Sequence, residues 1–108
     1  MRIYISGPIT GTTNYMQRFR EAAERIKKLG AEYVNPAHMA QTMPDADHED
    51  YMSIALKMLG KCDAMVMLAG SEDSEGCRRE YHEAKLHGIP VYYEMGGTAP
   101  LYEDATTL

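Results

Sequence analysis

The sequence predicts an α/β protein in which helices cover both faces of a central parallel sheet of four to five strands. Short apolar runs with strand character alternate with amphipathic helical segments along the chain, which is typical of right-handed βαβ crossovers. The run Asp63–Leu68 is apolar after its first residue, as expected of a parallel strand covered on both faces. The length of 108 residues fits one domain, spanning 1–108.

The first third of the chain supplies two strands and a helix to this pattern. Ile3–Ile5 predicts a short buried strand, which ends at the turn-forming residues that follow it. Apolar residues recur at helical spacing over Tyr15–Leu29, and Gly30 stands where a glycine commonly ends a helix. Tyr33 and Val34 predict the second strand.

The rest of the chain repeats the alternation after a long connection. The polar stretch Ala37–Glu49 is longer than most connections in a compact domain, and such loops are often functional lids. Helices are expected over Tyr51–Gly60 and Ser74–His87, and strands over Asp63–Leu68 and Ile89–Tyr93. The complete pattern predicts a flavodoxin- or Rossmann-like three-layer sandwich.

Composition narrows the classes of partner. The net charge of −5 argues against a nucleic-acid groove, which needs a basic stripe. Cys62 and Cys77 form neither a disulfide framework nor a metal-type spacing, and the four histidines have no metal-site spacing. No segment has the pattern of a signal peptide or a membrane span. We therefore expect a cytoplasmic protein with no metal, no cofactor, no membrane and no nucleic-acid partner.

The fold predicts where a ligand binds. In doubly wound sheets the ligand lies outside the carboxyl ends of the strands, where the strand order reverses. The loops leaving the first and third strands, Ser6–Thr13 and Ala69–Asp73, flank that point. The first loop is glycine-rich, so its backbone N–H groups can cradle a phosphate or a sugar hydroxyl, although a plain turn explains it equally well. Its spacing matches neither a P-loop nor a dinucleotide fingerprint.

The third predicted helix carries the second group of candidates. Ser74 suits the N-cap, where the helix end favours an anion, although capping alone explains it. Glu80 lies on the face of Gly76, four residues earlier, so a space is expected to open above its carboxylate. A solvated surface charge is the other interpretation of Glu80.

Three motifs in this order resemble the nucleoside 2-deoxyribosyltransferase superfamily. They are Tyr4-Ile5-Ser6-Gly7-Pro8-Ile9-Thr10-Gly11, Cys62-Asp63-Ala64 and Ser74-Glu75-Gly76-Cys77-Arg78-Arg79-Glu80-Tyr81. The resemblance covers about Arg2 to Tyr93. It is closest to short phage and bacterial members of unknown function, and next to 2′-deoxynucleoside 5′-monophosphate N-glycosidases.

The resemblance implies a role for each matching residue. Glu80 matches the nucleophile that attacks the anomeric carbon, and Tyr4 matches a tyrosine that orients it. Ser74 matches the position that binds the 5′-phosphate in the monophosphate enzymes. The loop matches the segment that wraps the sugar-phosphate and the base. The substrate-binding residues expected on this basis are Ser6, Gly7, Pro8, Ile9, Thr10, Gly11, Ser74 and Gly76.

The sequence departs from the superfamily at one position. Members usually carry an aspartate eight residues before the aspartate of the third strand, where it helps to protonate the departing base. Here that position is Ala55, which cannot transfer a proton. Either Asp47, Asp50 or Asp73 supplies the acid, or the leaving group needs little help, or the protein binds without turnover.

The resemblance, with Glu80, Tyr4 and Ser74 at the matching positions, predicts an N-glycosidase or deoxyribosyltransferase-like enzyme that acts on a nucleotide or nucleoside. The alternative is a non-catalytic nucleotide-binding or sensing module that has lost its general acid. The helix Tyr51–Gly60 is apolar on two sides, which indicates a subunit interface beside a core face. Members of the superfamily are oligomers, so the resemblance also implies a homo-oligomer.

Overall fold

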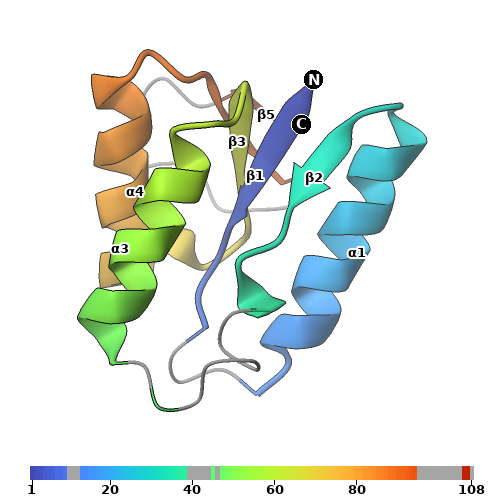
Figure 1. Cartoon of the computed structure of the whole chain (residues 1–108). Helices are drawn as coiled ribbons and strands as arrows, with labels where there is room; N and C mark the ends of the chain where they lie inside the picture. The colour runs from blue at the N-terminus through green and yellow to red at the C-terminus, as the bar shows by residue number, and fades with distance from the viewer. Residues whose placement is uncertain (10–12, 39–44, 46, 95–105, 108) are drawn as a thin grey trace.

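The computed structural model describes residues 1–9, 13–38, 45, 47–94 and 106–107. Five strands form one parallel sheet in the order β2-β1-β3-β4-β5 (Figure 1). The strands are β1 (Arg2–Ser6), β2 (Glu32–Val34), β3 (Ala64–Met67), β4 (Val91–Tyr93) and β5 (Thr106–Thr107). The helices are α1 (Tyr15–Lys28), α3 (His48–Leu59), the 3₁₀ turn η1 (Ser71–Asp73) and α4 (Glu75–Leu86).

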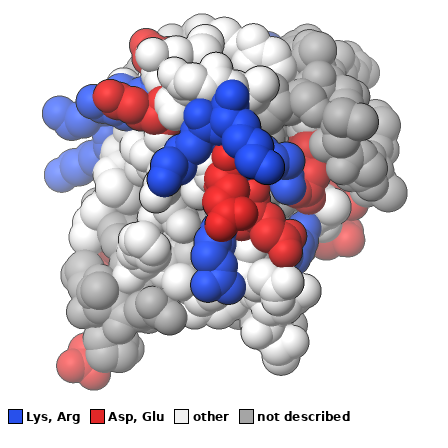
Figure 2. Space-filling model, turned by 90° about the vertical axis from the view of Figure 1, so that its right-hand side faces the viewer, with Lys and Arg blue, Asp and Glu red and all other residues white. Residues whose placement is uncertain are grey.

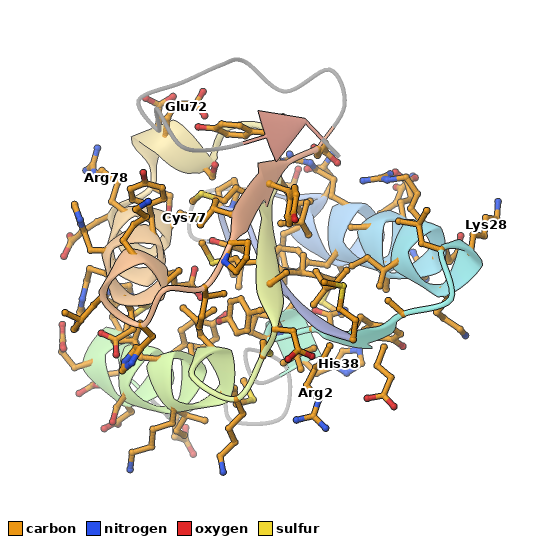
Figure 3. All side chains as sticks on the ribbon, turned by 90° about the horizontal axis from the view of Figure 1, so that it is seen from above. Arg2, Lys28, His38, Glu72, Cys77 and Arg78 are labelled. Carbon is orange, nitrogen blue, oxygen red and sulfur yellow. The ribbon has the colours of Figure 1, made fainter. Side chains whose placement is uncertain are left out.

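The sheet lies between two helical layers, as the alternation predicts. Helix α1 covers one face, and α3 and α4 cover the other (Figures 1 and 3). Successive side chains of β1 point to opposite faces of the sheet. Ile3 and Ile5 therefore pack in the core under α1, and Tyr4 packs in the core under α3 and α4. The strand order reverses between β1 and β3, so the switch point lies at the carboxyl ends of these two strands.

The start of α3 differs from the prediction. The helix begins at His48, three residues before the expected Tyr51, so its first turn belongs to what was predicted as loop. Asp47 is its N-cap and accepts a hydrogen bond from the Asp50 backbone N–H at 2.8 Å. The Asp50 side chain accepts from the Asp47 N–H in return, which completes a capping box. The capping box explains why this polar stretch is helical despite its weak apolar periodicity.

Glu94, which follows β4, joins three parts of the fold. Its carboxylate accepts a hydrogen bond from the Ala69 backbone N–H at 2.8 Å and pairs with Arg25 of α1 at 2.7 Å. Arg18 lies 3.6 Å from the same carboxylate and donates a hydrogen bond to the Ala69 carbonyl. These contacts hold the loop after β3 against α1. They therefore help to fix the position of this loop beside the switch point.

The surface over α1 carries both signs of charge. Figure 2 views the molecule from the α1 side and shows basic and acidic side chains next to one another there. The helix itself supplies both signs, for example Arg25 and Glu24. Within the described ranges, no helix combines the length and the apolar character that crossing a membrane requires.

Gly7 directly follows β1 and packs where a side chain has no room. A Cβ built there lies 2.9 Å from the Leu68 side chain and 3.1 Å from Phe19. We therefore expect Gly7→Ala to lower the free energy of unfolding by about 1–3 kcal/mol, because both neighbours belong to the buried core. Urea denaturation measures the change, with Gly60→Ala as the matched control. A Cβ at Gly60 makes only ordinary contacts, so equal losses in both variants would contradict the prediction.

Candidate active site

Glu80 projects from α4 toward the carboxyl end of β1 and is buried, with 5% of its surface exposed. Tyr4 donates a hydrogen bond from its hydroxyl to Oε2 of this carboxylate. Ser6 donates from Oγ to Oε1 at 2.8 Å. Tyr4 and Ser6 lie two residues apart on one strand, so their side chains share a face and both hydroxyls point to the α4 side. Each carboxylate oxygen therefore has its own donor. The solvated surface charge, the other interpretation of Glu80, is excluded by this burial.

Burial dominates the electrostatics of this carboxylate. Loss of solvation raises the pKa of Glu80 from 4.5 to about 7, and the hydrogen bonds from Tyr4 and Ser6 oppose that rise. Burial and the nearby Glu80 charge raise the pKa of Tyr4 well above its ordinary value, so the phenol stays a proton-bearing donor. Among the described residues, Glu80 is the one charged-type side chain in the buried core. It therefore exchanges its proton near neutral pH while two hydroxyls fix its orientation.

Removal of the Tyr4 hydroxyl tests how far its hydrogen bond opposes the effect of burial on the pKa of Glu80. Tyr4→Phe is expected to raise the pKa of Glu80 above about 7, because the hydrogen bond that favours the charged carboxylate is lost. A hydrogen bond to a charged group contributes about 1.5–3 kcal/mol, which corresponds to a rise of about one to two pH units. A ¹³C NMR titration of the Glu80 carboxyl measures the change. An unchanged or lower pKa in the variant would contradict the assigned hydrogen bond.

Ser74 caps α4 as the sequence predicts. Its Oγ accepts a hydrogen bond from the Cys77 backbone N–H at 3.3 Å. The Cys77 thiol is buried beside it, and burial followed by the Glu80 charge raises the pKa of that thiol to about 11. Hydrogen bonds with the Ser74 and Ser6 hydroxyls oppose the rise. A polar chain thus runs from the N-terminus of α4 through Cys77 and Ser6 to Glu80, and the thiol within it stays protonated.

The space expected at Gly76 is filled by α3. A Cβ at this glycine lies 3.3 Å from Sδ of Met52 and 3.7 Å from Cε1 of His48. The missing side chain therefore lets α3 pack closely against α4, and it does not open a gap above Glu80. The sequence-based reason for placing Gly76 in the site was wrong, because the helix that fills the space cannot be located from the periodicity of α4 alone.

The two predicted loops meet at the switch point. Gly7 packs against Leu68 at the end of β3, and Pro8 lies against Gly70, where a Cβ would be 3.6 Å from the proline ring. Ile9 packs on the core beneath α1. Thr10 and Gly11 lie outside the described residues. The close approach at Gly7 shows why a glycine follows β1.

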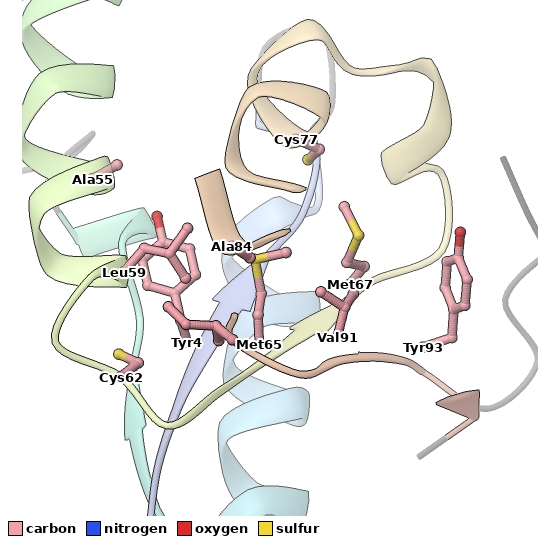
Figure 4. Close-up of a cluster of buried hydrophobic side chains, with 11 residues drawn as sticks. Tyr4, Ala55, Leu59, Cys62, Met65, Met67, Cys77, Ala84, Val91 and Tyr93 are labelled. Atoms are coloured by element: carbon pink, nitrogen blue, oxygen red, sulfur yellow. The ribbon is translucent and has the colours of Figure 1, made fainter. Parts of the chain in front are cut away.

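The candidate acids are exposed, whereas Glu80 is buried. Asp47 and Asp50 are exposed and engaged in the capping box of α3, and Asp73 is exposed in η1. Ala55 is fully buried and belongs to the same apolar cluster as Tyr4 (Figure 4). The position at which the superfamily usually carries an aspartate is therefore a packed core position in this chain.

Sequence reasoning missed two features of the centre. It assigned Ser6 to a ligand cradle, but its hydroxyl contacts Glu80; the spacing of two from Tyr4 in a strand was the available signal. It treated Tyr51 only as part of an apolar helix face, although the Glu80 charge acts on its phenol. Nothing in the local sequence indicates that electrostatic interaction.

Comparison with solved structures places this architecture in a known class. The chain superposes on the 2-deoxyribosyltransferase of Bacillus psychrosaccharolyticus with a TM-score of 0.71 and 17% identity, covering 94% of this chain and 78% of that one. That protein is described as a biocatalyst for the synthesis of antiviral and antitumoral nucleosides. The chain therefore has a nucleoside 2-deoxyribosyltransferase-like α/β fold.

The family follows from the sequence model that matches residues 1–93. The chain belongs to the family described as a domain of unknown function, DUF4406. No curated protein matches the chain.

Proposed function

We propose that this protein is an N-glycosidase or deoxyribosyltransferase-like enzyme that cleaves the base–sugar bond of a (deoxy)nucleoside 5′-monophosphate or nucleoside. The observation that carries the proposal is the buried Glu80 carboxylate, whose two oxygens accept hydrogen bonds from Tyr4 and Ser6. A structural ion pair does not account for this burial, because both donors are neutral hydroxyls. A carboxylate that is oriented, desolvated and able to titrate near pH 7 has the properties of a nucleophile.

The chemistry requires such a group. Cleavage of a glycosidic bond passes through an oxocarbenium-like state, which a neighbouring negative charge stabilises. In a retaining mechanism one Glu80 oxygen bonds to the anomeric carbon while the carbon–nitrogen bond breaks and its electron pair leaves with the base. Water or a second base then resolves the glycosyl ester and restores the carboxylate. Tyr4 holds the attacking carboxylate in position throughout and keeps its own proton.

The substrate side of the proposal rests on the loops at the switch point and on Ser74. The N-terminus of α4 favours an anion, and Ser74 lies there with its hydroxyl linked through Cys77 toward Glu80. This arrangement suits a 5′-phosphate at one end of a sugar whose anomeric carbon faces Glu80. The sequence leads us to expect further backbone N–H donors from the Ser6–Gly11 loop. A homo-oligomeric state and a cytoplasmic location stay predictions from the sequence.

A second candidate function is a non-catalytic module that binds or senses a nucleotide. The observation that favours it is the buried Ala55, since no carboxylate stands at that position to protonate the leaving base. The two candidates share the phosphate and sugar contacts and differ only in turnover.

Product analysis separates the two candidates. The purified chain is incubated with the four 2′-deoxynucleoside 5′-monophosphates and the four matching nucleosides, with and without a second free base, and products are resolved by chromatography. We expect release of free base from at least one substrate, and a new nucleotide or nucleoside where transfer occurs. Calorimetric binding of a monophosphate without any release would overturn the enzymatic proposal in favour of the binding module.

A further inference from the structure

Tyr51 lies in the first turn of α3, four residues before Ala55 and therefore on the same face of the helix. Its side chain is half-buried and packs against the apolar cluster that contains Tyr4. Its hydroxyl donates to the Pro36 carbonyl at 3.4 Å, just beyond the carboxyl end of β2. The long side chain of Tyr51 thus reaches the edge of the sheet where Glu80 lies, one helical turn nearer to that edge than Ala55.

The phenol of Tyr51 is also within the electrostatic reach of Glu80. Burial raises the pKa of Tyr51 well above 10, and the Glu80 carboxylate is the second cause of the rise. The hydroxyl therefore keeps its proton near neutral pH, where Glu80 begins to ionise. Its present hydrogen bond to Pro36 is long, so the same proton can turn toward a bound ligand at little cost.

The order of the strands places Tyr51 and Ser74 on opposite sides of Glu80. Tyr51 contacts the segment after β2, the hydroxyls that hold Glu80 come from β1, and Ser74 follows η1 after β3. In the sheet, β1 lies between β2 and β3. A sugar with its 5′-phosphate at Ser74 and its anomeric carbon at Glu80 therefore directs its base toward Tyr51.

We propose that the Tyr51 hydroxyl donates a hydrogen bond to the departing base, and so assists its departure in place of the acid that is absent at Ala55. This inference rests on the proposed function, and it names the group that assists the leaving base. As the carbon–nitrogen bond breaks, its electron pair moves onto the base nitrogen, and the Tyr51 hydroxyl stabilises that charge without losing its proton. In hydrolysis, water adds its hydroxyl to the anomeric carbon and its proton ends on the base, which leaves Glu80 as a carboxylate.

The test compares two leaving groups in Tyr51→Phe. One substrate is 2′-deoxyguanosine 5′-monophosphate, and the other is its 7-methyl derivative, whose base already carries a positive charge and leaves without a donor. We expect Tyr51→Phe to lower kcat/KM about 10²-fold on the first substrate and less than about threefold on the second. The matched control is Tyr33→Phe on β2, which removes a half-exposed phenol and is expected to change neither rate.

Three outcomes overturn the inference, and they differ from one another. Equal losses on both substrates would mean that Tyr51 only supports the packing of the site. If the wild-type protein cleaves only the methylated substrate, no group of the protein assists the leaving base. Release of no base by the wild type, either from these two substrates or from the eight nucleotides and nucleosides above, would remove the proposed function itself, and the inference with it. Because each variant is its own reference for the ratio of the two rates, a partial loss of folded protein does not affect the result.

Discussion

Glu80→Gln is expected to reduce base release by at least about 10³-fold, because an amide can neither attack the anomeric carbon nor offset the positive charge of the transition state. The substitution keeps the shape of the side chain, and its amide oxygen still accepts a hydrogen bond from Tyr4 or Ser6. Nucleotide binding should therefore survive. Single-turnover base release and calorimetry with the same monophosphate measure the two properties separately.

The chain offers a matched control on the same helix. Glu83 lies three residues further along α4 and pairs with His87 at 2.9 Å on a more exposed side. Glu83→Gln removes the same charge from α4 without touching the Tyr4 and Ser6 hydroxyls, so activity should stay within about twofold of the wild type. Equal activity in Glu80→Gln and the wild type would rule out Glu80 as the nucleophile.

The same Glu80→Gln substitution is expected to stabilise the fold above pH 7. The pKa of Glu80 is raised from 4.5 to about 7 in the folded protein, so the folded state binds this proton more tightly than the unfolded chain does. Stability from this group is therefore present at low pH and is lost as the pH rises from about 4.5 to about 7. At about 1.4 kcal/mol for each pH unit, the loss amounts to about 3 kcal/mol, and the neutral amide avoids it.

Urea denaturation at pH 5 and pH 8 measures this effect. Other titrating groups are common to both proteins, so the change in their difference between the two pH values isolates Glu80. We expect the advantage of Glu80→Gln to grow by about 2–3 kcal/mol from pH 5 to pH 8. A constant difference would show that the carboxylate is solvated in the folded protein. Gain of stability with loss of activity would indicate that the buried charge is kept for chemistry.

Local patterns were sufficient to predict the architecture. The apolar run Asp63–Leu68 and the helical spacing over Tyr15–Leu29 predicted a central strand and the helix that covers one face, and both are present as β3 and α1. Ser74 as a helix cap was predicted for the same reason, because capping depends on residues within one turn. Periods of two and 3.6 residues are properties of short segments, so they can be recognised without knowing how the chain folds.

The start of α3 and the filling of Gly76 show the limit of this reasoning. The capping box of Asp47 and Asp50 was visible in the sequence, but the weak apolar pattern after it hid the first turn. The space at Gly76 depends on Met52, a residue of another helix, and no periodicity within α4 reports it. Packing between elements is decided by three-dimensional fit, which a one-dimensional pattern does not contain.

The sequence by itself determined the layers of this protein, the edge of the sheet where we propose that a ligand binds, and Glu80 as the group to examine. Only the tertiary structure decided that this carboxylate is buried, that Tyr4 and Ser6 donate hydrogen bonds to its two oxygens, and that its charge acts on Tyr51 of α3. The physical reason is separation along the chain. The two hydroxyls lie 76 and 74 residues before the carboxylate they contact, so its environment forms only when the strands and helices assemble.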